Sequence, residues 1–216
     1  MAIVLDNITY TYGVGTPFEK TALKGISVTI ENGEFLGIIG HTGSGKSTFV
    51  QHLNGLLHPT TGKVTVNGVD VSEKTDEAKH MRHKVGMVFQ YPEHQLFEET
   101  IAEDIAFGPK NLGLDAEEVD RRVREAMAFV GLDYDTYAER SPFHLSGGQM
   151  RRVAIAGVVA MEPDFLGLDE PSAGLYPFGR EETFDEIIKL QKEKDVTVIS
   201  YLIIWKIFHA WRIVSL

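Results

Sequence analysis

The sequence contains no cysteine among its 216 residues, which excludes a disulfide framework and any metal site built from thiolates. Basic residues are also scarce, because 21 Lys and Arg stand against 31 Asp and Glu, a formal net charge of −10. A sequence-independent nucleic-acid binder needs a basic surface to displace counterions, so we expect no nucleic-acid partner. We also expect no secretory signal, because the first residues, MAIVLDNITY, include no basic residue and place Asp6 within the apolar stretch.

Long apolar runs are scarce as well, and the most hydrophobic one is the segment 196–216. Its length is about that of a membrane span, but it contains Lys206, His209 and Arg212, which are costly inside a bilayer. We therefore expect a buried strand, a short helix and another strand in this segment. The protein is predicted to be cytoplasmic, with the possibility of docking on a membrane partner.

Hydrophobic patterning predicts two kinds of strand. Alternating apolar residues predict two half-buried strands within the first thirty residues, joined by a loop at 13–17, and a hairpin with its turn at Asn67–Gly68. Continuous apolar runs are typical of strands buried on both faces. Such runs lie at 33–40, 84–90, 164–170 and 196–200.

Helical patterning dominates the middle of the chain. A helix is predicted from Lys46 to Leu57, another at 181–194, and a third that is capped by Asp115. The apolar residues of the third helix recur at helical spacing: Val119, Val123, Ala126, Met127 and Val130. The arginines between residues 121 and 124 are expected to form its solvated face.

The strongest motif is GHTGSGKST at Gly40–Thr48, which follows a predicted buried strand and opens a predicted helix. Glycines let such a loop turn its N–H groups toward phosphate oxygens at the start of a helix. We expect Lys46 to bridge the β- and γ-phosphates and the Ser47 hydroxyl to bind Mg²⁺, the expected cofactor. The predicted ATP-binding residues of this loop are Gly40, Thr42, Gly43, Ser44, Gly45, Lys46, Ser47 and Thr48.

A second phosphate-binding helix start is predicted in LSGGQMRR, residues 145–152. Gly147 and Gly148 leave backbone N–H groups accessible at the start of a helix, beside the hydroxyl of Ser146 and followed by Gln149. One ATP cannot be held by both segments if they lie far apart. The sequence therefore suggests that this segment binds the nucleotide of a partner chain.

Two acidic residues end the predicted strand in DFLGLDEP. Asp169 is placed to hold Mg²⁺, as is usual in P-loop enzymes. Glu170 is the candidate to orient and deprotonate the attacking water. The alternative, a strand end with solvated carboxylates, is less consistent with a chain that carries a phosphate loop.

Together these motifs resemble those of the ATP-binding cassette (ABC) family over nearly the full chain. The resemblance implies a P-loop NTPase of the α/β class, with a RecA-like core, an antiparallel β subdomain and a helical insert. The core and β subdomain would comprise 1–90 and 161–216, and the helical subdomain with its signature motif 91–160. Gln90 would bind and sense Mg²⁺ beside a membrane partner. Tyr12 would stack on adenine, with Tyr10 and a plain core role for Tyr12 as the rival readings.

A finer resemblance links the chain to the ATPases of energy-coupling factor (ECF) transporters, and its opening to the second of their paired ATPases. It is carried by YPEHQLFEETIAEDIAFGPKNLG at 91–113 and HLSGGQMRRVAIAGVVAMEPD at 144–164. The resemblance implies a peripheral protein on the cytoplasmic face of the membrane, which powers the import of vitamins or transition metals by a transporter. Its expected partners are a sister ATPase, a transmembrane coupling protein and a substrate-binding membrane protein, with the two ATPases forming a heterodimer.

Two positions depart from the family pattern. Tyr176 stands where the family has an aspartate that communicates across the ATPase pair, and Tyr201 where it has a histidine that contacts the γ-phosphate. Either the site is weakened, the sequence is altered, or the tail sequence was poorly determined, and we favour a poorly determined or shortened tail. Two rival functions follow from the sequence: a soluble ABC ATPase of DNA repair or translation, and a regulatory cassette that does not hydrolyse ATP.

Overall fold

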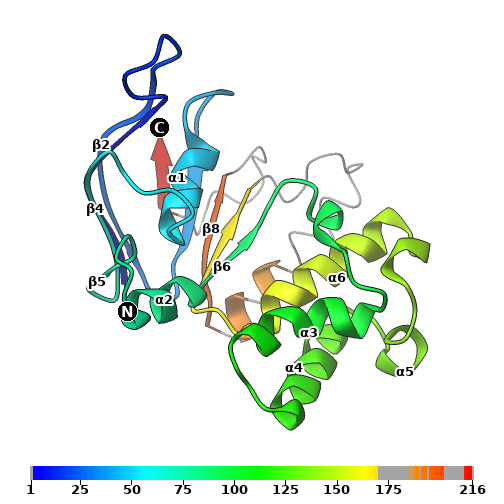
Figure 1. Cartoon of the computed structure of the whole chain (residues 1–216). Coiled ribbons are helices and arrows are strands. Elements are labelled where there is room, and N and C mark those ends of the chain that lie inside the picture. The colour runs from blue at the N-terminus through cyan, green and yellow to red at the C-terminus, as the bar shows by residue number, and fades with distance from the viewer. Residues whose placement is uncertain are drawn as a thin grey trace. The chain divides into compact units, whose positions relative to one another are not determined.

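The computed structural model describes residues 2–169, 185, 187–189, 191–193, 195–201 and 212–215. The chain forms two compact units, which are best described one at a time (Figure 1). The first, which we call the sheet unit, comprises 1–87, 164–170 and 191–216. The second, the helical unit, comprises 88–163 and 171–190.

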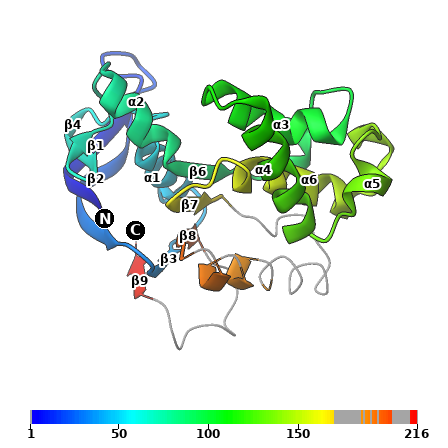
Figure 2. The same cartoon turned by 90° about the horizontal axis from the view of Figure 1, so that it is seen from below.

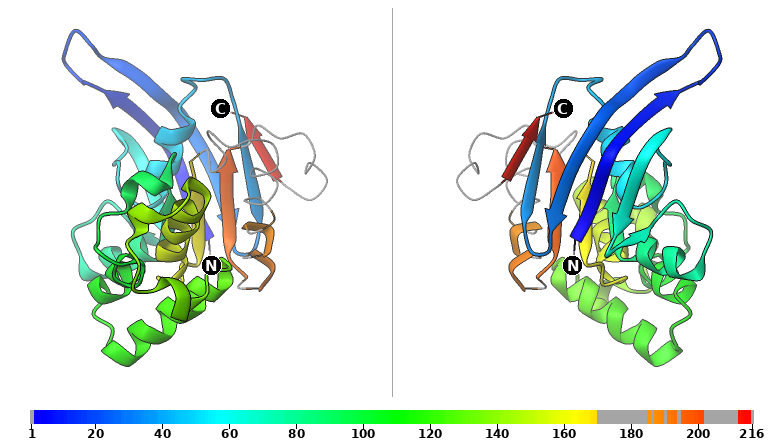
Figure 3. Two further views of the ribbon diagram at one scale, coloured as in Figure 1. Left: turned by 90° about the vertical axis from the view of Figure 1, so that its right-hand side faces the viewer. Right: turned by 90° about the vertical axis from the view of Figure 1, so that its left-hand side faces the viewer.

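An antiparallel sheet opens the sheet unit, in the order β2-β1-β4-β5. Its strands are β1 (Ala2–Tyr12), β2 (Lys20–Glu31), β4 (Thr61–Val66) and β5 (Val69–Asp70). Figure 3 shows β1 and β2 as a long hairpin, which confirms the two alternating strands predicted from the sequence. Asn67 and Gly68 both have positive φ, 52° and 84°, as the predicted tight turn between β4 and β5 requires.

A five-stranded sheet forms the rest of the core, in the order β6-β7-β8-β3-β9. Its strands are β3 (Phe35–Ile39), β6 (Val85–Val88), β7 (Phe165–Leu168), β8 (Thr197–Tyr201) and β9 (Arg212–Ser215). The pairs β3–β8, β3–β9 and β7–β8 are parallel. The strands predicted from apolar runs are confirmed, although β3, β6 and β7 are shorter than predicted, because glycine and polar residues flank the apolar stretches.

Two helices of the sheet unit differ from the sequence predictions. Helix α1 (Lys46–Leu53) begins where predicted but ends four residues before Leu57, because Gly55 takes a φ of 72° that a helix cannot continue. Helix α2 (Asp76–His83) was not predicted. Its N-cap is Thr75, whose hydroxyl accepts a hydrogen bond from the N–H of Ala78.

In the described part of the helical unit, three longer helices pack against one another: α3 (Ile101–Asn111), α4 (Ala116–Phe129) and α6 (Gly147–Val159) (Figure 2). The 3₁₀ helix η1 (Pro92–Gln95) precedes α3, and helix α5 (Tyr134–Tyr137) and the 3₁₀ helix η2 (Pro142–His144) lie between α4 and α6. The Asp115 carboxylate caps α4 by accepting from Glu118 N at 2.9 Å. The apolar positions predicted for this helix are all buried, so the prediction of a capped amphipathic helix is confirmed.

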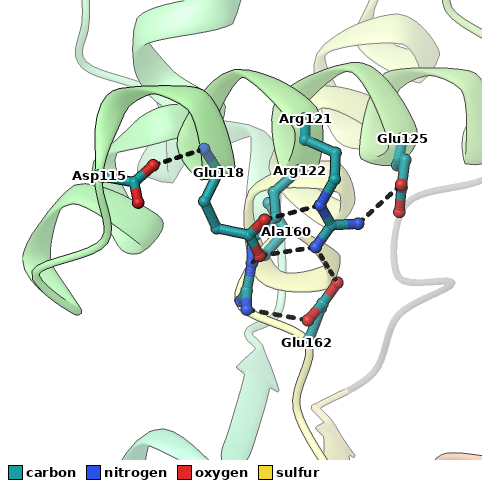
Figure 4. Close-up of polar contacts among 7 residues, drawn as sticks. All are labelled: Asp115, Glu118, Arg121, Arg122, Glu125, Ala160 and Glu162. Atoms are coloured by element: carbon teal, nitrogen blue, oxygen red, sulfur yellow. Dashed lines mark hydrogen bonds and ion pairs between the residues drawn. The ribbon is translucent and has the colours of Figure 1, made fainter.

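The charged face of α4 is exposed at Arg121 and Arg124, as predicted, and its side chains form an ion-pair network (Figure 4). Arg121 pairs with Glu118 at 2.6 Å and with Glu125 at 2.7 Å. Glu162, beyond the end of α6, pairs with both Arg121 and Arg122. The side chain of Arg122 is only 14% exposed, so the network fastens α4 to the chain that follows α6.

Parts of the C-terminal predictions lie outside the described residues. Residues 185, 187–189 and 191–193 are helical, within the helix predicted at 181–194. The helix predicted between β8 and β9 lies outside the described part of the chain. Within the described residues, no helix combines the length and apolar character needed to cross a bilayer.

Candidate functional site

The predicted phosphate loop lies between β3 and α1, in the strand–loop–helix setting that the motif requires. Gly43 and Gly45 have φ values of 83° and 100°, which favour glycine. A Cβ on Gly45 would also lie 2.7 Å from the carbonyl oxygen of Ala22 on β2. The loop therefore needs glycine at Gly45 for both its backbone conformation and its close contact with the antiparallel sheet.

Lys46 lies at the first residue of α1 and folds its side chain back over the loop. Its Nζ donates hydrogen bonds to the carbonyl oxygens of Gly40 at 2.9 Å and His41 at 3.0 Å. The loop is closed by a hydrogen bond from Ser44 N to His41 O at 3.1 Å. This geometry holds an ammonium group beside the start of a helix, where both favour an anion.

Ser47 and Asp169, two of the three predicted magnesium ligands, meet although they are far apart in sequence. Ser47 Oγ donates a hydrogen bond to Asp169 Oδ1 at 3.2 Å, and Asp169 follows β7 with only 7% of its surface exposed. Gly167 brings β7 close to α1, because a Cβ there would lie 2.9 Å from Val50 Cγ1. The contact thus depends on tight packing of a glycine in the strand.

These two side chains fit a magnesium ion held jointly by protein and phosphate. Mg²⁺ prefers oxygen donors and is commonly bound through one or two carboxylates together with the substrate's phosphates. A hydroxyl and a carboxylate meet that description. Among the described residues there is no group of three or more His, Cys, Asp or Glu that could hold a metal by itself.

The predicted adenine-stacking residue, Tyr12, ends β1 with 41% of its surface exposed. Its hydroxyl lies 2.9 Å from Thr48 Oγ1, on the helix that follows the phosphate loop. The rival residue, Tyr10, is half-buried and packs edge-on against Tyr12, with 4.8 Å between the ring centroids. Of the two rings, Tyr12 is the one with more surface available to a ligand. Thr42, another predicted loop residue, is exposed, and its carbonyl oxygen lies 2.8 Å from His41 Nδ1.

The predicted signature segment starts helix α6 in the helical unit. Ser146 is the N-cap, and it forms a reciprocal capping box with Gln149, whose Nε2 also donates to Tyr137 Oη at 3.3 Å. Gly147 and Gly148 are exposed, and apart from their own chain neighbours and helix backbone no described atom lies within 4 Å of a Cβ built on either one. The Ser146–Gln149 capping box and Tyr137 therefore fix the start of α6, while Gly147 and Gly148 leave its surface open.

The remaining predicted site residues are less fully described. Gln90 lies two residues after β6, in the helical unit, with its side chain exposed. Glu170 and Tyr176 lie outside the described residues. The backbone of Tyr201 ends β8, opposite Ile38 of β3, while its side chain is outside the description. The roles of these residues stay predictions.

Two contacts and one buried histidine near the predicted site were not specified by the sequence. Arg151 of α6 is 3% exposed and forms an ion pair with Glu93 of η1 at 3.3 Å, which links the signature helix to the segment after Gln90. The Tyr137 hydroxyl oxygen accepts a hydrogen bond from Gln149 Nε2. His52 is fully buried. Only the last had a local signal, because a residue four positions after Thr48 faces the same side of a helix.

A parallel sheet with a phosphate loop, a Ser–Asp pair at its end and a capped glycine helix defines a P-loop nucleotide-binding domain. A family model described as ABC transporter matches residues 23–173, well over half of the chain. The chain is 60% identical over 199 residues to the energy-coupling factor transporter ATP-binding protein EcfA2 of Clostridium acetobutylicum, covering 92% of this chain and 70% of that protein. The EcfA2 protein of Clostridium perfringens is 58% identical with the same coverage.

Solved structures agree with this relationship. The cbiO1 protein of Clostridium perfringens, described as part of the ABC transporter complex cbiONQ, has a TM-score of 0.80 and 37% identity, covering 92% of this chain and 77% of its own. The ATP-binding cassette MJ0796, solved as a dimer with ADP and phosphate, has a TM-score of 0.84 and 31% identity, covering 99% and 94%. The chain therefore belongs to the ABC transporter family, as an ATP-binding subunit of the energy-coupling factor type. The predicted fold class and ATPase activity are confirmed.

Proposed function

We propose that this chain binds Mg-ATP between its own phosphate loop and the signature segment of a sister ATPase. Gly40–Thr48 would hold the phosphates from one side, and Ser146–Gln149 of the sister chain from the other. The open start of α6 supports this arrangement, because Gly147 and Gly148 are exposed and, their own helix and chain neighbours apart, no described atom lies within 4 Å of a Cβ placed on either one. The dimer of the related cassette MJ0796 with ADP and phosphate supports pairing of such domains.

The observation that carries the proposal is the hydrogen bond between Ser47 and Asp169 at 3.2 Å. It joins the end of the phosphate loop to the end of β7, so that a magnesium ion on the phosphates could be bound by both side chains. Gln90 is proposed as a further ligand of that ion. Glu170, which directly follows Asp169, would accept a proton from the attacking water, while Lys46 stabilises the charge on the phosphates.

Hydrolysis would reopen the ATPase pair and so move a transmembrane coupling protein, which carries a separate substrate-binding membrane protein. This places the chain on the cytoplasmic face of the membrane as a peripheral subunit and makes it part of an importer for a vitamin or a transition metal. The printed names of the relatives support a transporter of the energy-coupling factor class. The sister ATPase is proposed to be a different chain, giving a heterodimer.

The decisive experiment replaces Glu170 by Gln in the assembled transporter complex. Loss of the general base is expected to lower ATP turnover about 100-fold or more, with ATP binding retained. Glu139→Gln, an exposed position in the helical unit, serves as a matched control that keeps wild-type turnover. Unchanged turnover in Glu170→Gln would remove Glu170 from its role.

The same assay addresses the two departures from the family pattern. If turnover is lost when the equivalent glutamate of the sister chain is replaced but persists in Glu170→Gln, the sister's site carries the hydrolysis. That result would favour the regulatory cassette suggested by Tyr176 and Tyr201.

A further inference from the structure

Three aromatic rings form a continuous row from the protein surface into the sheet unit: Tyr12, Tyr10 and His52, which we call the ring cluster. Tyr10 packs edge-on against both of its neighbours. Its ring centroid lies 4.8 Å from that of Tyr12, at an interplanar angle of 90°, and 4.8 Å from that of His52, at 77°. Such edge-to-face pairs fix the relative orientation of rings. Tyr12 is the exposed end of the row, and His52 is its buried end.

Both ends of the ring cluster bind the same residue of helix α1. The Tyr12 hydroxyl lies 2.9 Å from Thr48 Oγ1, and His52 Nδ1 lies 2.6 Å from the Thr48 carbonyl oxygen. A carbonyl oxygen only accepts hydrogen bonds, so Nδ1 must carry the proton. Thr48 is itself the last residue of the predicted phosphate loop, and it is 7% exposed. The cluster and the loop therefore share one anchoring residue.

A histidine at position 52 is difficult to explain by core packing alone. Its ring is fully buried, and its Nε2 has no hydrogen-bond partner among the described residues. Burial lowers the pKa of His52, so the ring is neutral and Nε2 is an unsatisfied acceptor. A buried polar atom without a partner costs free energy that an aliphatic side chain would avoid. The features specific to histidine here are the flat ring against Tyr10 and the Nδ1 hydrogen bond to Thr48.

We infer that His52 and Tyr10 are positioning residues that hold the Tyr12 ring in the orientation on which adenine stacks. The inference rests on the proposed function, in which Thr48 belongs to the phosphate loop, and on the prediction from the sequence that Tyr12 stacks on adenine. Because Thr48 anchors both ends of the ring cluster, the orientation of the stacking ring and the position of the loop helix are linked. Binding of the base and binding of the phosphates should then support each other.

The test compares a ligand that has a base with one that lacks it. Calorimetry on the full chain gives dissociation constants for Mg-ATP and Mg-tripolyphosphate, and their ratio measures the contribution of the nucleoside. We expect Tyr12→Ala to lower the preference for ATP about tenfold, because base–aromatic stacking is removed. His52→Leu is expected to lower it about threefold, as for the loss of one hydrogen bond, with tripolyphosphate affinity unchanged.

Leu53→Val is the matched control, because it also changes a buried side chain in the last turn of α1 but belongs to neither the ring cluster nor the phosphate loop. It should leave the preference for ATP unchanged. Equal losses of affinity for both ligands in His52→Leu, or no loss for either, would overturn the positioning role. If His52→Leu does not fold, Tyr12→Phe removes only the hydroxyl on Thr48 and should lower the preference about threefold. An unchanged preference in Tyr12→Phe would overturn the anchoring by Thr48.

The result for the wild-type chain separates this inference from the proposed function. If neither ligand binds, the proposed nucleotide site is wrong, and the inference fails with it. If both bind with equal affinity, the phosphate site stands, but the base does not use the Tyr12 ring, and the inference alone is overturned.

Discussion

The phosphate loop and the signature segment both begin a helix with glycine, but the surroundings of their glycines are opposite. Gly45 has a φ of 100°, and a Cβ there would lie 2.7 Å from the carbonyl oxygen of Ala22. Gly147 and Gly148 lie within α6, and within the described part of the chain nothing approaches the place of their Cβ atoms. The fold of this chain requires glycine in the loop. At the signature, only a ligand that comes close to the helix start would require it.

The largest effect on stability is expected from Gly45→Ala. Alanine at this φ is strained by about 1–3 kcal/mol, and the Ala22 carbonyl would have to move as well. The free energy of unfolding, measured by urea denaturation, should fall by about 3 kcal/mol. Gly15→Ala is the matched control, because Gly15 also has a positive φ of 75° but no atom of the described residues within 4 Å of its Cβ position. Equal losses in the two variants would show that the contact with Ala22 is unimportant.

A slightly smaller loss of stability is expected from Arg151→Met, in the signature helix α6. The Arg151 and Glu93 side chains are 4% and 17% exposed, and removing one partner of a buried pair leaves the other charge uncompensated. Because Glu93 retains some exposure, we expect a loss of about 2–3 kcal/mol in the free energy of unfolding. Arg124→Met, which breaks an exposed pair with Asp120, should cost less than about 1 kcal/mol. Similar losses for both would argue against a special role of the buried pair.

Gly148→Ala should change stability least among the substitutions at the helix starts. Alanine favours a helix over glycine by up to about 1 kcal/mol, and the structure offers room for the methyl group. The melting temperature should therefore stay constant or rise slightly. Turnover of the assembled complex should nevertheless fall by about tenfold or more, because the methyl group displaces the phosphates. Full turnover in a stable Gly148→Ala complex would contradict the proposed partner site.

Local sequence patterns predicted some elements of the chain and missed others. The phosphate loop is a local motif between a buried strand and a helix, and its predicted setting was confirmed. Asp115 and the helical spacing of apolar residues likewise identified α4. Helix α2 was missed because Ala78 is its only buried residue, so it has no apolar periodicity to detect.

Long-range contacts account for most of what the sequence could not predict. The ion pair of Arg151 with Glu93 joins residues that are 58 positions apart, and no local pattern specifies it. Burial of His52 had only the weak signal of its helical spacing from Thr48, because a polar residue becomes part of the core through its neighbours in space. The meeting of Ser47 with Asp169 was expected only because both positions belonged to recognised motifs. Local patterns thus predicted elements, whereas packing decided which polar residues became buried partners.

The smallest effect on stability is expected in the ion-pair network on α4, where side-chain charges and not glycines are tested. Hydrogen bonds from Arg121 and Arg122 lower the pKa of Glu118 from 4.5 to about 2. A carboxyl group whose pKa is lower in the folded state stabilises the fold above its unfolded pKa of 4.5 and loses that contribution as the pH falls toward 2. The difference in melting temperature between the wild type and Glu118→Gln should therefore be present at pH 7 and should vanish near pH 2.

Glu117→Gln provides the control for this titration, because Glu117 lies in the same first turn of α4 and is exposed. It carries the same charge near the helix start, so any effect of the helix dipole is shared by the two variants. Only Glu118→Gln should show a difference that disappears between about pH 4.5 and pH 2, and high salt should weaken it, because the network is largely exposed. Parallel pH profiles for the two variants would mean that the arginines contribute little, and that helix-start charge alone explains the effect.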